Sequence, residues 1–139
     1  MDLGHWQCES QIPKDCYGFI YKITNNITDR MYIGKKQMVQ RITRPPLKGK
    51  KNKRRLLCES DWKTYTGSCR ELNKDIEKLG IENFSFIILR LCYNKSQLAY
   101  YEVKEQVQRD VLLKDEYYNG MINCRIGKIN QDGSKFTST

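Results

Sequence analysis

The feature that most constrains this chain is a pair of strand-like segments around a polar turn in residues 18–36, GFIYKITNNITDRMYIGKK. In residues 18–25, Phe19, Tyr21 and Ile23 alternate with Ile20, Lys22 and Thr24, so that the two sets would lie on opposite faces of a strand. These residues are also rich in types that favour strands. The turn NNITDR is rich in Asn and Asp, which bond their own backbone in turns. MYIG then resumes as a second strand. The sequence therefore predicts an antiparallel hairpin with Tyr21 on one strand and Tyr32 on the other, 11 positions apart.

Positive charge is concentrated directly after this hairpin. The 139 residues carry a formal net charge of +9. Eleven of the 25 basic residues lie in residues 30–58, a window without any acid, which leaves 14 basic against 16 acidic residues elsewhere. A segregated basic block implies a polyanionic partner, whereas an evenly basic chain would only be soluble. The alternative interpretation is a solvated charge run.

Length and composition exclude several other classes. The chain is long enough to bury a core of its own, which predicts a single domain over residues 1–139. No apolar run approaches the roughly 18–20 residues of a membrane-spanning helix, and the polar N-terminus does not look like a signal peptide. The six cysteines form no CxxC pair, so zinc-site spacing is absent. His5, Cys8 and Cys16 could supply three metal ligands, but buried free thiols in a reducing, cytoplasmic compartment are the default expectation.

The residues after the hairpin are expected to leave the sheet. Residues 35–44 can start a helix, which Pro45 and Pro46 would end. LKGKKNKRRLLCES is polar and basic, which predicts an exposed loop, so a basic insert is expected at about residues 45–58.

Two helices and a buried strand are predicted further on. CRELNKDIEKLG fits a short amphipathic helix with Gly80 as its C-cap, and NFSFIILRLCY fits a buried strand. Ser96 is the expected N-cap of a helix over residues 97–113. Its core stripe would consist of Ala99 or Tyr100, Val103, Val107 and Val111. With a short last strand in residues 115–127, the order predicts an α/β fold: a small mixed or antiparallel three-stranded sheet flanked by helices.

Glu102 is the carboxylate with the best position for chemistry. It lies beside Val103, so its side chain is expected at the margin of the buried face, partly removed from water. Such a carboxylate suits a hard divalent cation, which proteins hold with one or two carboxylates plus phosphate oxygens. The alternative is a surface acid paired with Arg109.

These features together resemble the GIY-YIG nuclease superfamily, which includes homing endonucleases, restriction enzymes and repair nucleases. GFIY and YIG look like its signature, and GSCRELNKDIEKLGIENFSFIIL is similar to its helix-and-strand segment. KSQLAYYE resembles its catalytic helix and YYN its late asparagine, so the resemblance covers about residues 17–127. YIGKK, the lysine-rich insert and the DEYYN stretch are also similar to a phage subgroup of small standalone endonucleases.

The resemblance implies catalytic roles for specific residues. Tyr21 would deprotonate or position the attacking water, and Tyr32 would hydrogen-bond water or phosphate. Glu102 would be the single protein ligand of the metal. Asn119, with Asn123 as the alternative, would orient the site. A free tyrosine with a pKa near 10 is a poor base at neutral pH, so neighbouring cations such as Lys35, Lys36 or the metal would have to stabilise the phenolate.

One departure concerns the arginine that the family usually places on a helix about ten residues after the second tyrosine. Position ten here is Ile42, with Arg41 at nine and Arg44 at twelve. Arg41 is the first candidate and Arg44 the second. Lys36 or a residue of the insert at 48–55 could take the role instead.

The resulting hypothesis is a divalent-metal-dependent endonuclease that hydrolyses phosphodiester bonds of double-stranded DNA with Mg²⁺ or Mn²⁺, in homing, restriction or host-DNA breakdown. One site cuts one strand, so a double-strand break requires a homodimer or sequential nicking. The residues expected to bind nucleic acid are Lys35, Lys36, Lys48, Lys50, Lys51, Lys53, Arg54 and Arg55. The alternative hypothesis is a catalytically weak or inactive nucleic-acid-binding module that uses the basic insert.

Overall fold

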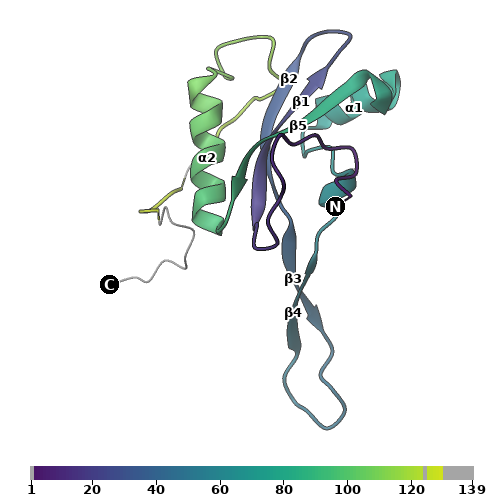
Figure 1. The fold of residues 1–139 in the computed structure, drawn as a ribbon, viewed down its shortest axis with the longest axis vertical. Helices are drawn as coiled ribbons and strands as arrows, with labels where there is room; N and C mark the ends of the chain where they lie inside the picture. The colour runs from purple at the N-terminus through teal and green to yellow at the C-terminus, as the bar shows by residue number, and fades with distance from the viewer. Residues whose placement is uncertain (1, 124, 130–139) are drawn as a thin grey trace.

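A computed structural model describes residues 2–123 and 125–129, without the side chain of Arg55. The chain folds around an antiparallel three-stranded sheet in the order β2-β1-β5, and a separate two-stranded sheet, β3-β4, projects from this body (Figure 1). The elements are, in chain order, β1 (Gly18–Asn25), β2 (Met31–Gln37), β3 (Val39–Arg44), β4 (Arg54–Glu59), the 3-10 turn η1 (Trp62–Thr64), α1 (Arg70–Leu79), the 3-10 turn η2 (Ile81–Asn83), β5 (Phe84–Cys92) and α2 (Lys95–Gln108). The predicted α/β class with a small three-stranded sheet is confirmed.

The predicted hairpin is confirmed as β1 and β2. Its register places Tyr21 opposite Gly34 and Ile23 opposite Tyr32. The turn closes because the Asn25 side chain accepts hydrogen bonds from the backbone N–H of Ile27 at 3.0 Å and of Thr28 at 3.2 Å, as expected for a turn residue of this type.

Alternation along β1 divides the core between the two faces of the sheet. Phe19, Tyr21 and Ile23 face the side that carries the N-terminal segment, η1 and α1. Ile20 faces the other side, where Leu98 of α2 packs against it and against Ile33. Because side chains of a strand alternate between faces, one strand supplies both cores.

Residues 35–44 are strand, so the predicted helix there is wrong. β2 continues to Gln37, and β3 pairs with β4 in a register that runs from Val39 opposite Glu59 to Arg44 opposite Arg54. The partner of β3 is RRLLCE, for which the sequence predicts a loop, and pairing with this strand holds residues 39–44 extended. Only residues 45–53 at the tip connect the two strands as a loop.

The predicted helices have different outcomes. α1 is confirmed, with Leu72 buried and the Gly80 N–H donating to the Ile76 carbonyl at 2.9 Å. In α2 the N-cap is Asn94, whose side chain accepts from the Gln97 N–H at 2.8 Å, so the assignment of Ser96 is wrong. The helix also ends at Gln108, five residues before the predicted end at 113. Among the described residues of 115–127, the predicted last strand is reduced to an isolated bridge between Met31 and Tyr117.

The core stripe predicted for α2 is right only at Val111, which is buried beyond the end of the helix. Tyr100 and Val107 are exposed, while Leu98 and Gln106 are buried against the sheet. Residues four apart lie on one line of a helix, so Glu102 stands between Leu98 and Gln106 on the line that faces the sheet. It is therefore closer to the centre of the buried face than the sequence predicted.

Candidate active site

The two motif tyrosines meet over a glycine of the neighbouring strand. Tyr21 is 1% exposed, and its ring centroid lies 6.1 Å from that of Tyr32. A Cβ at Gly34 would lie 2.5 Å from the Tyr21 hydroxyl oxygen and 2.9 Å from the Tyr32 ring. Gly34 therefore makes room for both rings, and any side chain there would displace them.

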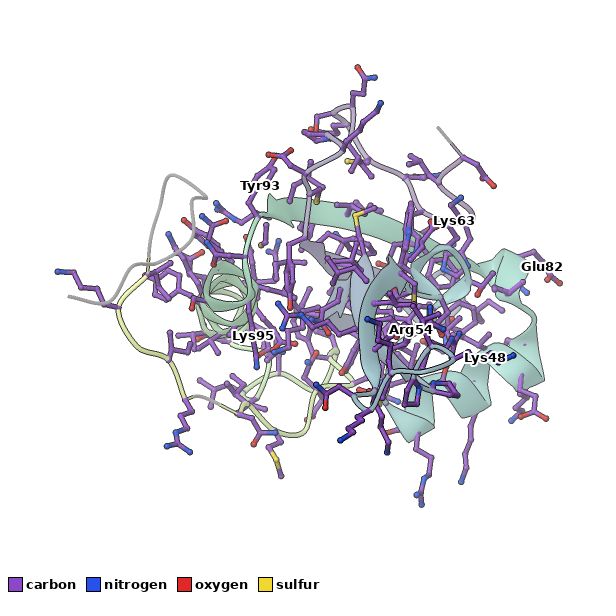
Figure 2. All side chains as sticks on the ribbon, turned by 90° about the horizontal axis from the view of Figure 1, so that it is seen from below. Lys48, Arg54, Lys63, Glu82, Tyr93 and Lys95 are labelled. Carbon is purple, nitrogen blue, oxygen red and sulfur yellow. The ribbon has the colours of Figure 1, made fainter. Side chains whose placement is uncertain are left out.

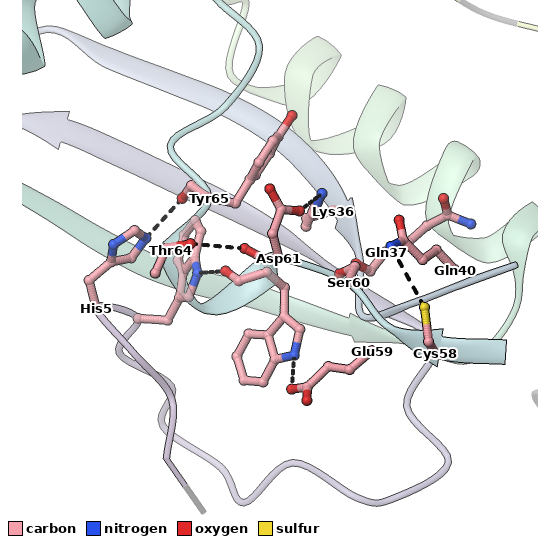
Figure 3. A network of polar contacts seen from close by, with 12 residues as sticks. His5, Lys36, Gln37, Gln40, Cys58, Glu59, Ser60, Asp61, Thr64 and Tyr65 are labelled. Atoms are coloured by element: carbon pink, nitrogen blue, oxygen red, sulfur yellow. Dashed lines mark hydrogen bonds and ion pairs between the residues drawn. The ribbon is translucent and has the colours of Figure 1, made fainter. Parts of the chain in front are cut away.

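Tyr65 joins this pair from the segment after η1. Its ring lies 6.2 Å from that of Tyr21 at a steep angle, and a hydrogen bond between the two side chains adds to burial in raising the pKa of Tyr21. Lys36 of β2 places its ammonium 4.0 Å from the centre of the Tyr65 ring. The same ammonium lies 2.6 Å from the carboxylate of Asp61 (Figure 3). Lys36 is thereby fixed beside the tyrosines.

Glu102 approaches β2 from the opposite side, on α2. Its carboxylate lies 4.0 Å from the Lys35 ammonium, and its side chain is 18% exposed. Arg109, its predicted alternative partner, binds Glu105 instead at 3.3 Å. Burial raises the pKa of Glu102, and the Lys35 charge opposes this effect. Loss of hydration disfavours the charged form of a carboxyl group, so Glu102 is a carboxylate kept in a poorly solvated place.

Neither tyrosine is prepared to ionise. Burial raises the pKa of Tyr21 well above its ordinary value, and the neighbouring Tyr32, Tyr65 and Glu102 raise it further. Burial also raises the pKa of Tyr32, although a hydrogen bond with Ser68 lowers it in part. At neutral pH both groups are neutral phenols that donate and accept hydrogen bonds.

Asn119 secures the strand that carries the motif. Its side-chain oxygen accepts from the Ile33 N–H at 3.0 Å, and its amide donates to the Ile33 carbonyl at 2.8 Å. Gln106 of α2 donates to the same carbonyl at 3.0 Å. β2 is the edge strand of the sheet, and a buried backbone group without a partner would be costly. Asn119 therefore fixes the backbone between Tyr32 and Gly34.

A comparison with protein families decides the relationship of this arrangement to known proteins. A family model described as "Putative endonuclease segE, GIY-YIG domain" matches residues 4–122 of the chain. The chain belongs to this GIY-YIG family. No curated protein and no solved structure matches it.

The family is one of putative endonuclease domains. GIY-YIG nucleases generally use divalent metal ions and act on nucleic acid. No group of three or more His, Cys, Asp or Glu side chains that could hold a metal occurs in residues 2–123 and 125–129. The ligand set of His5, Cys8 and Cys16 is therefore wrong. A lone, poorly solvated carboxylate such as Glu102 does fit a hard cation that completes its shell with water and phosphate oxygens.

The structure does not bring every predicted GIY-YIG site residue to the tyrosines. Arg41 and Arg44 lie on β3, and Arg41 lines the pocket beside the one lined by Lys36 and Tyr65. Asn123 is exposed after α2. The basic residues of the insert, from Lys48 to Arg54, lie at and beside the tip of the β3–β4 hairpin, which projects away from the three-stranded sheet (Figure 1).

Three contributors to the site had weak signals in the sequence. Gln106 belongs to no recognisable motif, Lys95 only begins the KSQLAYYE segment and Tyr65 lies in the stretch SDWKTYTGS, and each reaches β2 or its pocket through a contact distant in the sequence. A search for motifs cannot show that these residues meet, because the fold alone brings them close.

No helix in the described part of the chain is long and apolar enough to cross a membrane.

Proposed function

We propose that this GIY-YIG domain is a divalent-metal-dependent DNA endonuclease whose site is formed by Tyr21, Tyr32, Glu102 and Lys36, with Asn119 as a positioning residue. The observation that carries the proposal is the convergence on β2 of two neutral phenols, one fixed ammonium and one desolvated carboxylate. Phosphodiester hydrolysis needs these groups: hydrogen bonds to water and phosphate, and positive charge against the phosphate.

The raised pKa values determine the roles of the tyrosines in this proposal. Since Tyr21 and Tyr32 stay protonated at neutral pH, they orient the attacking water and a phosphate oxygen by hydrogen bonds. Lys36 supplies the positive charge to the scissile phosphate that the family's arginine would otherwise supply. Arg41 and Arg44 remain the alternatives.

Glu102 would hold the metal, Mg²⁺ or Mn²⁺, which when bound supplies charge neutralisation at the phosphate and the leaving oxygen. The reaction consumes one water molecule. Its oxygen forms a bond to phosphorus, the bond from phosphorus to one ester oxygen breaks, and the proton that water loses balances the proton that the leaving oxygen gains.

The β3–β4 hairpin supports duplex DNA as the substrate. Its tip carries Lys48, Lys50, Lys51, Lys53 and Arg54 on an exposed two-stranded ribbon. A ribbon of two strands fits the width of the major groove of B-DNA. One site per domain cuts one strand at a time, so a double-strand break requires two copies or two successive nicks.

Nicking of supercoiled plasmid in Mg²⁺ or Mn²⁺ tests the proposal. We expect the wild type to nick, and Glu102→Gln to lose at least about a hundredfold in rate while DNA binding persists, because loss of one electrostatic contributor commonly costs this much. Tyr32→Phe should lose rate as well. The matched control is Glu105→Gln, one turn away on α2, with a side chain that is 15% exposed and paired with Arg109.

Two outcomes would overturn the proposal. Nicking by Glu102→Gln at the wild-type rate would remove Glu102 from the site. Binding of DNA by the wild type without any metal-dependent nicking would favour the binding module instead.

A further inference from the structure

A groove runs from the candidate active site to the start of α2. It consists of two pockets, of about 260 Å³ and 790 Å³, that share Gln37, Gln40 and Lys95 in their walls. The first is lined by Lys36 and Tyr65, and the second by Arg41, Tyr17 and Tyr93. We call the two together the lateral groove.

The lateral groove is positively charged. Its walls contain Lys35, Lys36, Arg41 and Lys95, and no acidic side chain lines it. Lys35 and Lys36 are paired with Glu102 and Asp61. Arg41 and Lys95 have no ion pair within 4.0 Å in the described part of the chain. The cations without an acidic partner are therefore Arg41 in the second pocket and Lys95 in the wall that both pockets share.

Aromatic rings accompany these cations. Tyr17 is held in place by a hydrogen bond from the Gln37 side chain to its hydroxyl. Tyr93 lies at the junction of β5 and α2, and both tyrosines are only partly buried. Figure 2, seen from the end at which the hairpin projects, places Tyr93 and Lys95 on the α2 side of the hairpin. Cations for phosphates combined with aromatic rings for bases are the usual features of sites for single-stranded nucleic acid.

The volume of the lateral groove fits a single strand of nucleic acid but not a duplex. Pockets of roughly 300–1,000 Å³ take ligands of drug size, which is the size of a nucleotide or two. A duplex is far wider and would contact the exposed hairpin instead.

We propose that the lateral groove binds an unpaired stretch of the nucleic-acid strand beside the cleaved bond, with phosphates at Arg41 and Lys95 and a base against Tyr17 or Tyr93. The proposal rests on the proposed function for its position next to the site, and extends it by naming the ligand. Preferred substrates are then duplexes with a few unpaired nucleotides next to the cut, such as gaps, flaps or the opened regions of supercoiled DNA.

Binding of a fluorescein-labelled dT8 oligonucleotide and of a 20-base-pair duplex, both without metal, tests this inference by anisotropy. The groove variant is Arg41→Glu with Lys95→Glu. The matched control, with the same change in charge, is Lys48→Glu with Lys51→Glu at the hairpin tip. We expect the groove variant to lose at least tenfold in affinity for dT8 and less than threefold for the duplex, and the control to show the reverse pattern.

Photocrosslinking identifies the contact independently of folding effects. An oligonucleotide with one 5-iodouracil should attach to Tyr17 or Tyr93 of the wild type. The inference is overturned if crosslinks fall only on residues 48–55, if wild type does not bind dT8, or if both double variants weaken both ligands equally. Because none of these measurements involves cleavage, failure of the groove and failure of the endonuclease proposal are distinguishable.

Discussion

A single residue, Met38, separates β2 of the three-stranded sheet from β3 of the hairpin, yet the sheet and the hairpin differ in almost every physical property. Phe19, Ile20 and Ile23 in the sheet are fully buried. In the hairpin no described side chain is buried, and Leu57 is 69% exposed. An isolated two-stranded ribbon is only marginally stable in water, so the hairpin depends on its anchor at Met38, whose N–H and carbonyl bond to Tyr17 and Ser60.

This difference separates two tasks. In the proposed endonuclease, the groups that act on the reacting bond must be held in place, and packing of the sheet and α2 does this for Tyr21, Tyr32 and Glu102. Groups that collect a polyanion only need to be charged and accessible, and the hairpin presents them in this way. Substitutions in the two regions should therefore affect different measurements.

The largest expected effect is on DNA affinity, from changing Lys48, Lys50, Lys51 and Lys53 to Gln. Each lost phosphate contact reduces the slope of log affinity against log salt by about 0.9, so four contacts correspond to a loss on the order of 100- to 1,000-fold near physiological salt. Duplex binding over a salt series measures both the affinity and its dependence on salt. Thermal stability should change little because the side chains are exposed.

A matched control keeps the net charge equal. Lys14, Lys74, Lys78 and Lys114 are exposed lysines of the body, and the same four changes to Gln there should leave the salt slope near the wild-type value. Equal effects of the two sets would show that total charge, and not the hairpin, governs binding.

The next effect is on folding, from Asn119→Ala in the body. The Ile33 N–H would lose its partner in a buried place, while the carbonyl keeps Gln106. An unsatisfied buried donor costs about 1–3 kcal/mol, so we expect the free energy of unfolding in urea to fall by that amount. Asn123→Ala, at an exposed position, should stay within about 0.5 kcal/mol of the wild type. A similar small change for both would mean that Asn119 does not hold the edge of β2.

The smallest effect is a pH-dependent gain in stability from Glu102→Gln. Burial raises the pKa of Glu102 in the folded state, so the folded state binds the proton more tightly than the unfolded state. Stability then decreases as pH rises from the ordinary glutamate pKa of about 4.3 through the raised folded value. The variant lacks this loss, so it should be more stable than the wild type at pH 7 and equal to it below about pH 4.

Denaturation of both proteins at the two pH values measures this difference. Glu82→Gln is the control, because Glu82 is exposed. A Glu102→Gln protein that is less stable than the wild type at pH 7 would show that the ion pair with Lys35 outweighs the desolvation of the carboxylate.

The sequence by itself determined the features that depend on neighbouring residues. The alternation around NNITDR predicts the β1–β2 hairpin, and the Leu72–Ile76–Leu79 spacing with Gly80 predicts α1, because turn chemistry and periodicity act over a few positions. The same hairpin predicts that Tyr21 and Tyr32 lie on neighbouring strands, whereas the candidacy of Asn119 came from the resemblance to the family and that of Glu102 from its position beside Val103 together with this resemblance.

Only the tertiary structure decided the rest. The apolar residues of α2 are spread over all sides of the helix and do not mark one face. Its sequence therefore did not reveal that Leu98, Glu102 and Gln106 face the sheet. Residues 39–44 are a strand because RRLLCE pairs with them after a loop of nine residues, 45–53. That pairing also carries Arg41 into the lateral groove and away from Tyr32. These outcomes depend on contacts between distant residues, and no local pattern encodes which partner a strand or a helix face will find.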